Sequence, residues 1–154
     1  MNVDVDMKSV VAGVALALVA LSSNAGEFNE SNGVAIKGYD PVAFFKDSNP
    51  VRGKDDLRFE YKGSNFVFAN AENRAAFATA PEKYAPQYGG YCAFGTARGY
   101  KADIDPSTFT VIDGRLYLNY NAQVQREWSA DTGRFIRQAD ERWPTVTKTE
   151  KVFR

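Results

Sequence analysis

The sequence contains no histidine, only one cysteine, Cys92, and two methionines, Met1 and Met7. Imidazole and sulfur supply many of the metal ligands and nucleophiles of small domains. Without histidine, a Ser-His-Asp triad and a Cys-His pair are excluded. Any chemistry must come from one thiol, from carboxylate, phenol, amine or guanidinium groups, or from the backbone. No catalytic constellation is recognisable, so the sequence does not indicate an enzyme.

An excess of charge is also lacking, because 19 basic residues balance 19 acidic ones. Proteins that bind nucleic acid or anionic lipid usually carry a basic excess. We therefore expect no nucleic-acid partner. Aromatic residues form 14% of the chain, which is typical of a folded domain and not of a disordered one.

One apolar run is present, over residues 10–21. Its length, about 12 residues, fits the centre of a signal peptide and is too short for an ordinary membrane-spanning helix. Small residues precede Gly26 as at a cleavage site. We expect 1–25 to be a signal peptide, starting at Met1 or Met7, and the mature protein to be periplasmic or secreted without a membrane span. An uncleaved anchor or a buried apolar helix is the alternative.

The rest of the chain predicts one small α+β domain in which short antiparallel hairpins pack against short helices. The hairpins are expected where turn residues separate extended runs, 57–61 with 65–68 and 109–112 with 115–120. Short strands are expected over 34–36 and 99–102. Helices are expected over 42–45, 71–79, 122–129 and 135–142. A loose entry segment over 26–33 and a polar tail over 145–154 flank the domain, which covers 34–144.

Three pieces of the central region occur in a characteristic order, namely Asp40-Pro41-Val42, an aromatic hairpin over 59–68 and Pro81-Glu82-Lys83-Tyr84. Together they resemble the YHS family, small domains associated with heavy-metal handling. The segment over 88–143 resembles an extension found in secreted bacterial members. The resemblance implies a YHS-like core with a C-terminal hairpin-helix extension that covers it.

The usual metal ligands of that family are not present. Metal-associated members carry cysteine at three positions, and the matching residues here are Ala43, Ala69 and Asn73. Alanine has no donor atom, and an amide is a poor ligand for a soft metal. The resemblance therefore implies a degenerate metal site.

Cys92 lies in a loop rich in glycine and aromatic residues, with Tyr88, Tyr91, Phe94 and Tyr100 nearby in sequence. Glycine allows close backbone approach, and tyrosines can line an apolar pocket. These residues could bind a small ligand, or a soft ion such as copper or zinc through Cys92. Alternatively, the rings are core residues and Cys92 is a buried thiol that packs as a small hydrophobic group.

Asp103 and Asp105 form a weaker candidate for a metal site, because alternate side chains of an extended segment share one face. The alternative is an ordinary loop in which Asp105 makes a local turn. We therefore expect an exported, non-enzymatic binding domain of YHS type with a pocket near Cys92. A structural or protein-interaction module, in which Cys92 only packs, is the second interpretation. The identity of any ligand or protein partner does not follow from the sequence.

Overall fold

A computed structural model describes residues 27–154 of the protein. The expected signal peptide over 1–25 lies outside the described residues. Among the helices of 27–154, none has the length and apolar character needed to cross a bilayer.

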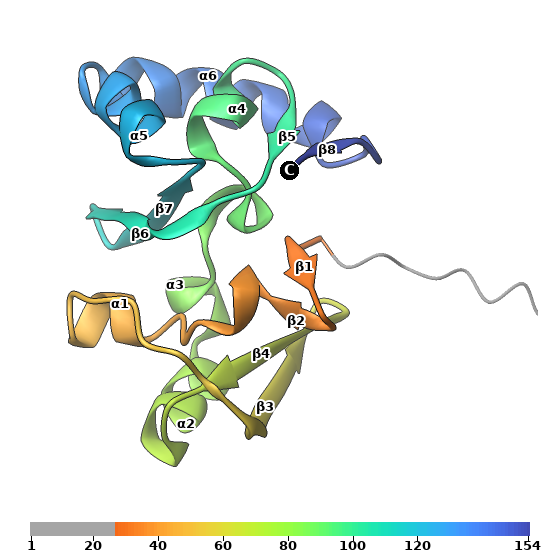
Figure 1. Ribbon diagram of the computed structural model, residues 1–154, viewed down its shortest axis with the longest axis vertical. Coiled ribbons are helices and arrows are strands. Elements are labelled where there is room, and N and C mark those ends of the chain that lie inside the picture. The colour runs from red at the N-terminus through yellow and green to blue at the C-terminus, as the bar shows by residue number, and fades with distance from the viewer. Residues whose placement is uncertain (1–26) are drawn as a thin grey trace, which may run out of the picture.

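The chain forms two halves, one after the other in sequence (Figure 1). The lower half contains β1 (Glu30–Ser31), β2 (Val34–Ala35), the 3-10 turn η1 (Ile36–Gly38), α1 (Ala43–Lys46), β3 (Lys54–Tyr61), β4 (Ser64–Phe68), α2 (Ala71–Thr79) and α3 (Pro81–Tyr84). The upper half contains the 3-10 turn η2 (Gln87–Gly90), α4 (Ala93–Ala97), β5 (Lys101–Ala102), β6 (Asp105–Ile112), β7 (Arg115–Asn119), α5 (Ala122–Ser129), α6 (Thr132–Val146) and β8 (Val152–Phe153). The predicted α+β class is confirmed.

Both predicted hairpins are present, β3 with β4 and β6 with β7. Lys62 and Gly63 connect the first pair with φ values of 48° and 77°, and Asp113 and Gly114 connect the second with 51° and 72°. Two successive residues with positive φ match the right-handed twist of the strands they join. Local turn chemistry therefore determines the register next to each turn, and the register shifts farther along both hairpins, between Lys54 and Arg58 and between Asp105 and Thr110.

Two helices have the predicted bounds because capping residues mark their starts. The side chains of Asn70 and Asn121 accept hydrogen bonds from the backbone N–H groups of Asn73 and Val124. The predicted bounds of the last helix, 135–142, were wrong at both ends, since α6 begins at Thr132 and continues through Pro144 to Val146. A proline in the last turn removes only one helical hydrogen bond, so the helix can continue past it.

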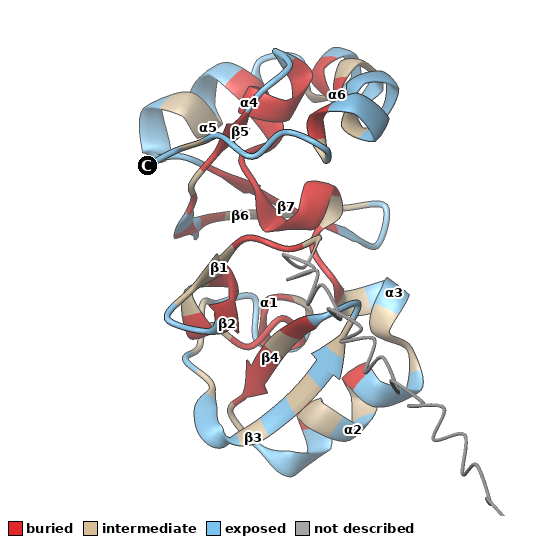
Figure 2. Cartoon of the chain, turned by 90° about the vertical axis from the view of Figure 1, so that its right-hand side faces the viewer, coloured by how far each residue is buried: buried red, intermediate tan, exposed pale blue. Residues whose placement is uncertain are grey.

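One hydrophobic core extends through both halves. In the lower half, the buried ring of Phe77 packs against four aromatic rings, those of Phe59, Tyr61, Phe66 and Phe68. Phe44 and Phe109 join the halves, with ring centroids 5.2 Å apart. In Figure 2, buried segments include β2 and β4 of the lower half and β7 and α4 of the upper half, while β3 and α2 are more exposed. The continuous core is consistent with a single small domain.

Both ends of the described chain are more ordered than predicted. The expected loose entry segment contains β1 and buries Phe28 and Asn29. The backbone N–H of Asn29 donates to the Gly89 carbonyl at 2.7 Å, so this polar segment is held by η2.

The expected polar tail contains β8, which pairs in parallel with β5. This parallel pair also departs from the predicted pattern of antiparallel hairpins. The sequence could not reveal it, because the two strands have only two residues each and lie far apart along the chain.

Candidate functional site

The five residues predicted to surround one pocket lie in separate places. Tyr88 begins a left-handed turn with Gly89 and Gly90, and the backbone is extended at Tyr91, directly before Cys92. Successive side chains of an extended segment point to opposite sides. The structure therefore places Tyr88 at one hollow and Cys92, Phe94 and Tyr100 at another.

Tyr88 and Tyr91 pack against Trp143 of α6, with ring centroids 6.1 and 6.3 Å from the indole. Cys92 instead lines a hollow together with Phe94 and Tyr100. The aromatic loop thus contributes to two different surroundings.

The contacts of Cys92 are those of a buried structural residue, and only 1% of its surface is exposed. Its Sγ accepts a hydrogen bond from the Gly95 N–H at 3.4 Å, which caps α4, and donates to Asn119 Oδ1 at 3.5 Å. Burial raises the pKa of the Cys92 thiol, and hydrogen bonds from backbone N–H groups offset this only in part. A protonated thiol is a weak nucleophile and a weak metal ligand.

The hollow beside this thiol is called the Cys92 hollow. Its volume is about 330 Å³, and it is lined by Cys92, Phe94, Tyr100, Ala102, Tyr120, Val124 and Phe153. Tyr100 and Phe153 form one edge of it, packed edge to face with centroids 5.2 Å apart. A Cβ atom at Gly95 would lie 3.0 Å from the Tyr100 ring, so glycine at this position allows the ring to lie against α4.

Exposed large hydrophobic side chains concentrate at this hollow. Among the described residues, the exposed ones are Tyr100 at 36%, Val111 at 38%, Tyr120 at 39% and Phe153 at 46%. Three of these four line the hollow. Scattered exposed hydrophobic residues are ordinary, but a gathering around a concave surface is typical of a binding site.

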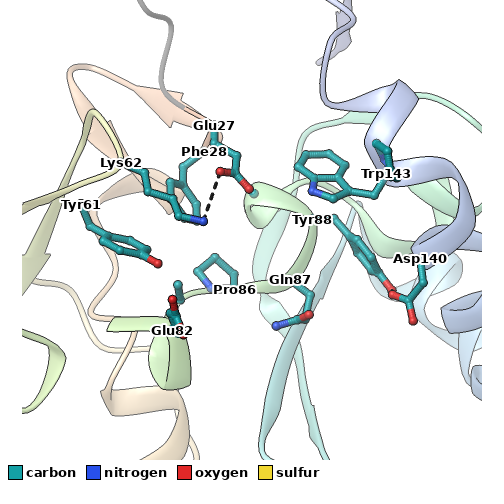
Figure 3. Close-up of a pocket in the computed structure, with 13 residues that line it drawn as sticks. Glu27, Phe28, Tyr61, Lys62, Glu82, Pro86, Gln87, Tyr88, Asp140 and Trp143 are labelled. Atoms are coloured by element: carbon teal, nitrogen blue, oxygen red, sulfur yellow. Dashed lines mark hydrogen bonds and ion pairs between the residues drawn. The ribbon is translucent and has the colours of Figure 1, made fainter. Parts of the chain in front are cut away.

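A second hollow of about 330 Å³ opens between the two halves and is called the interlobe cleft (Figure 3). Residues of both halves line it, namely Glu27, Phe28, Tyr61, Lys62, Glu82, Ala85, Pro86, Gln87, Tyr88, Gly89, Asp140, Trp143 and Pro144. Apart from Tyr88, the sequence did not indicate these residues as a site. They come from the first described residues, the end of β3, α3, η2 and α6, and only the folding of both halves brings them together.

The three positions at which the YHS resemblance implies metal ligands surround the buried carboxylate of Asp40. Its Oδ1 accepts a hydrogen bond from the Ala43 N–H at 3.2 Å. Its Oδ2 accepts from the Ala69 N–H at 2.9 Å and from Asn73 Nδ2 at 2.8 Å. Two methyl groups and an amide already bonded to Asp40 offer no soft ligand. The hydrogen bonds of Asp40 therefore connect α1, the residue after β4, and α2.

Asp103 and Asp105 make separate sets of contacts. Asp103 forms an ion pair with Lys37 at 3.1 Å and accepts a hydrogen bond from Asn29. Asp105 accepts from the N–H and hydroxyl groups of Ser107 in a local turn. The hydrogen bonds of the Cys92 thiol go to Asn119 and Gly95, and to neither aspartate. Within 27–154, no cluster of three or more histidine, cysteine, aspartate or glutamate side chains could hold a metal ion.

Comparison of the chain with protein-family models, curated proteins and solved structures finds no match.

Proposed function

We propose that the protein is an exported, non-enzymatic binding domain of YHS type, and that the Cys92 hollow holds a compact apolar ligand. The observation that carries this proposal is the gathering of Tyr100, Tyr120 and Phe153 around an apolar concave surface. Binding would remove these exposed side chains from water. Burial of one large apolar side chain is worth about 2 kcal/mol, so even a small ligand gains affinity there.

The character of Cys92 supports binding over catalysis. Cys92 lines the hollow, and its thiol is buried and has a raised pKa. It therefore remains protonated at neutral pH and contributes a soft, polarizable surface to the ligand. The sequence contains no histidine that could act as its general base.

The proposed YHS relationship is supported by the motifs around Asp40 and by the convergence of Ala43, Ala69 and Asn73 on its carboxylate. The proposed export is supported by the apolar run over 10–21. Mass spectrometry of the protein purified from its host tests export directly. A mature chain that begins at Gly26 is expected, and an intact chain that begins at Met1 or Met7 would contradict it.

Titration with the neutral fluorescent probe N-phenyl-1-naphthylamine tests the binding proposal. Its fluorescence should rise saturably with the wild-type protein. Phe153→Ser and Tyr120→Ser should each weaken binding about ten-fold, because each removes apolar contact surface. Val111→Ser is the matched control, since Val111 is similarly exposed but does not line the hollow. Absence of saturable binding, or equal binding by all three variants, would contradict the proposal.

A protein-interaction module is the second candidate function. It is favoured by the exposure of Phe153, the most exposed of the large hydrophobic side chains among the described residues. An apolar side chain of a partner could fill the same hollow. Under this alternative, the probe does not bind, whereas a purified partner binds the wild-type protein and loses affinity for Phe153→Ser.

A further inference from the structure

The interlobe cleft shares no lining residue with the Cys92 hollow and plays no part in the proposed function. Its volume of about 330 Å³ is at the small end of the range of sites that bind organic molecules. A ligand in this cleft would touch both halves of the protein. The aromatic walls of the cleft and the charges that face it determine which kind of ligand it can bind.

Aromatic rings form two walls of the cleft. In Figure 3, Phe28 and Tyr61 stand on one side, and Trp143 and Tyr88 stand on the other. Gly89 lies between these sides, and a Cβ atom there would overlap the Glu27 carbonyl oxygen and approach the Trp143 ring to 3.3 Å. Glycine at position 89 therefore allows the backbone at Glu27 and the Trp143 ring to lie this close to η2.

Carboxylates outnumber cations among the residues that line the cleft. Glu27 pairs with Lys62, whose Nζ lies 3.5 Å from its Oε2. Glu82 and Asp140 have no ion-pair partner among the described residues. The Tyr88 hydroxyl donates to Asp140 Oδ1 at 2.8 Å, which fixes the carboxylate without neutralising its charge. The cleft therefore carries negative charge that its own cation does not balance.

Lys62 illustrates how the cleft can hold a cation. Its Nζ lies 5.4 Å from the centroid of the Tyr61 ring and beside the Glu27 carboxylate, so it contacts both an aromatic face and an anion. Trp143 and Asp140, both on α6, offer the same two groups at the opposite wall. No described lysine or arginine lies over the Trp143 ring. Tryptophan offers the strongest of the aromatic faces for a cation.

We propose that the interlobe cleft binds a small organic cation, an ammonium group on an apolar body. The ammonium group lies near the Asp140 carboxylate and the Trp143 ring, and Glu82 adds to the negative potential. The apolar body packs against the neighbouring rings of Phe28 and Tyr61 on the other side, whose centroids lie 5.9 Å apart. This chemistry differs from that of the Cys92 hollow, which has no charged lining residue.

Calorimetric titration of the purified protein with three matched probes tests the charge preference. 3-Phenylpropylamine carries an ammonium group, 3-phenylpropanol is neutral, and 3-phenylpropionate is anionic. The amine should bind at least about ten-fold more tightly than the alcohol, because it adds a cation–π contact and an attraction to carboxylates. The propionate should bind most weakly. Failure of the amine to bind, or equal binding of amine and alcohol, would overturn the proposal.

Substitutions then locate the site. Asp140→Asn removes the charge but keeps an oxygen that can accept from Tyr88, and it should weaken amine binding about five-fold or more. Glu141→Gln is the matched control, since Glu141 is the next residue of α6 and does not line the cleft. Equal effects of the two changes would overturn the assignment. Binding of N-phenyl-1-naphthylamine at the Cys92 hollow should be unchanged in Asp140→Asn, so the two sites can be tested independently.

Discussion

At the scale of single residues, burial decides what the only thiol can do. A thiol such as that of Cys92 can be a metal ligand or a nucleophile, yet its Sγ is hydrogen-bonded to the Gly95 N–H and to Asn119 Oδ1. Its bonds cap α4 and connect it to β7. The sequence could raise both interpretations of Cys92, but only the packing of α4 and β7 around it separates them.

Thiol labelling checks this account of Cys92. Ellman's reagent at pH 8 should modify the native protein at least about 100-fold more slowly than the urea-unfolded protein, because burial blocks access and raises the pKa. The unfolded protein is the internal control for intrinsic reactivity. Similar rates in both states would mean that the thiol is accessible.

Asp103 predicts a specific pH dependence of stability. Burial by itself would raise the pKa of this carboxyl group, but bonds from Asn29 and Ile104 N–H and the ion pair with Lys37 outweigh it and lower the pKa. The stabilisation is therefore fully present above the pKa of an unfolded aspartate, about 4, and is lost as the pH falls through the lower folded pKa.

Urea unfolding as a function of pH measures this contribution. Asp103→Asn should be less stable than the wild type at pH 7, and the difference should shrink below about pH 4. Asp105→Asn is the control, because Asp105 is exposed and its side chain bonds only to Ser107 in its own turn. A difference that is independent of pH would contradict the role given to the Asp103 charge.

At the scale of elements, short turns with positive φ position the site. The left-handed run of Tyr88, Gly89 and Gly90 directs the Tyr88 ring toward α6. It also lets the Gly89 carbonyl accept from Asn29. The interlobe cleft therefore depends on the conformation of η2.

Two glycine substitutions separate backbone strain from close packing. Gly114→Ala should lower the free energy of unfolding by about 1 kcal/mol, because φ is 72° and nothing lies near the added Cβ atom. Gly89→Ala should cost at least about 2 kcal/mol more, since its Cβ would also overlap the Glu27 carbonyl. Denaturant unfolding of both variants measures the difference. Equal losses would show that the segment near Glu27 yields without cost.

At the scale of the whole molecule, the two ends of the described chain meet. Arg154 donates to Asn29 Oδ1 at 3.1 Å, and β8 pairs with β5 beside the Cys92 hollow. Phe153 forms part of that hollow. The last residues, expected to be a polar tail, therefore contribute to the candidate site.

Removal of residues 151–154 tests this contribution. The shortened protein should lose binding of N-phenyl-1-naphthylamine, and its Cys92 should react faster with Ellman's reagent, because Phe153 no longer covers the hollow. Arg154→Ala is the control, since it removes the contacts of the Arg154 side chain with Asp103 and Asn29 but keeps Phe153 and β8. Unchanged labelling and binding after truncation would contradict the role assigned to β8.

The sequence predicted the parts of the fold that depend on neighbouring residues. The hairpins follow from Lys62-Gly63 and Asp113-Gly114, and two helices follow from Asn70 and Asn121 as caps. Long-range packing decides the rest. The pairing of β5 with β8 and the entry of Phe28 into the core depend on surfaces that no local pattern describes.

The candidate site was predicted only in part for the same reason. Cys92, Phe94 and Tyr100 do line one hollow, but Tyr120, Val124 and Phe153 reach it from distant segments. Tyr88 lies at the interlobe cleft instead. Sequence proximity brought together side chains that the left-handed turn and the extended backbone after it send in different directions.

The most direct test of the central claim is an amide NMR titration of the protein with N-phenyl-1-naphthylamine. If the Cys92 hollow is the binding site, saturable shifts should concentrate at Phe94, Tyr100, Tyr120 and Phe153. Shifts concentrated at Trp143 and Asp140, or no saturable shifts at all, would contradict the assignment of apolar ligand binding to the Cys92 hollow.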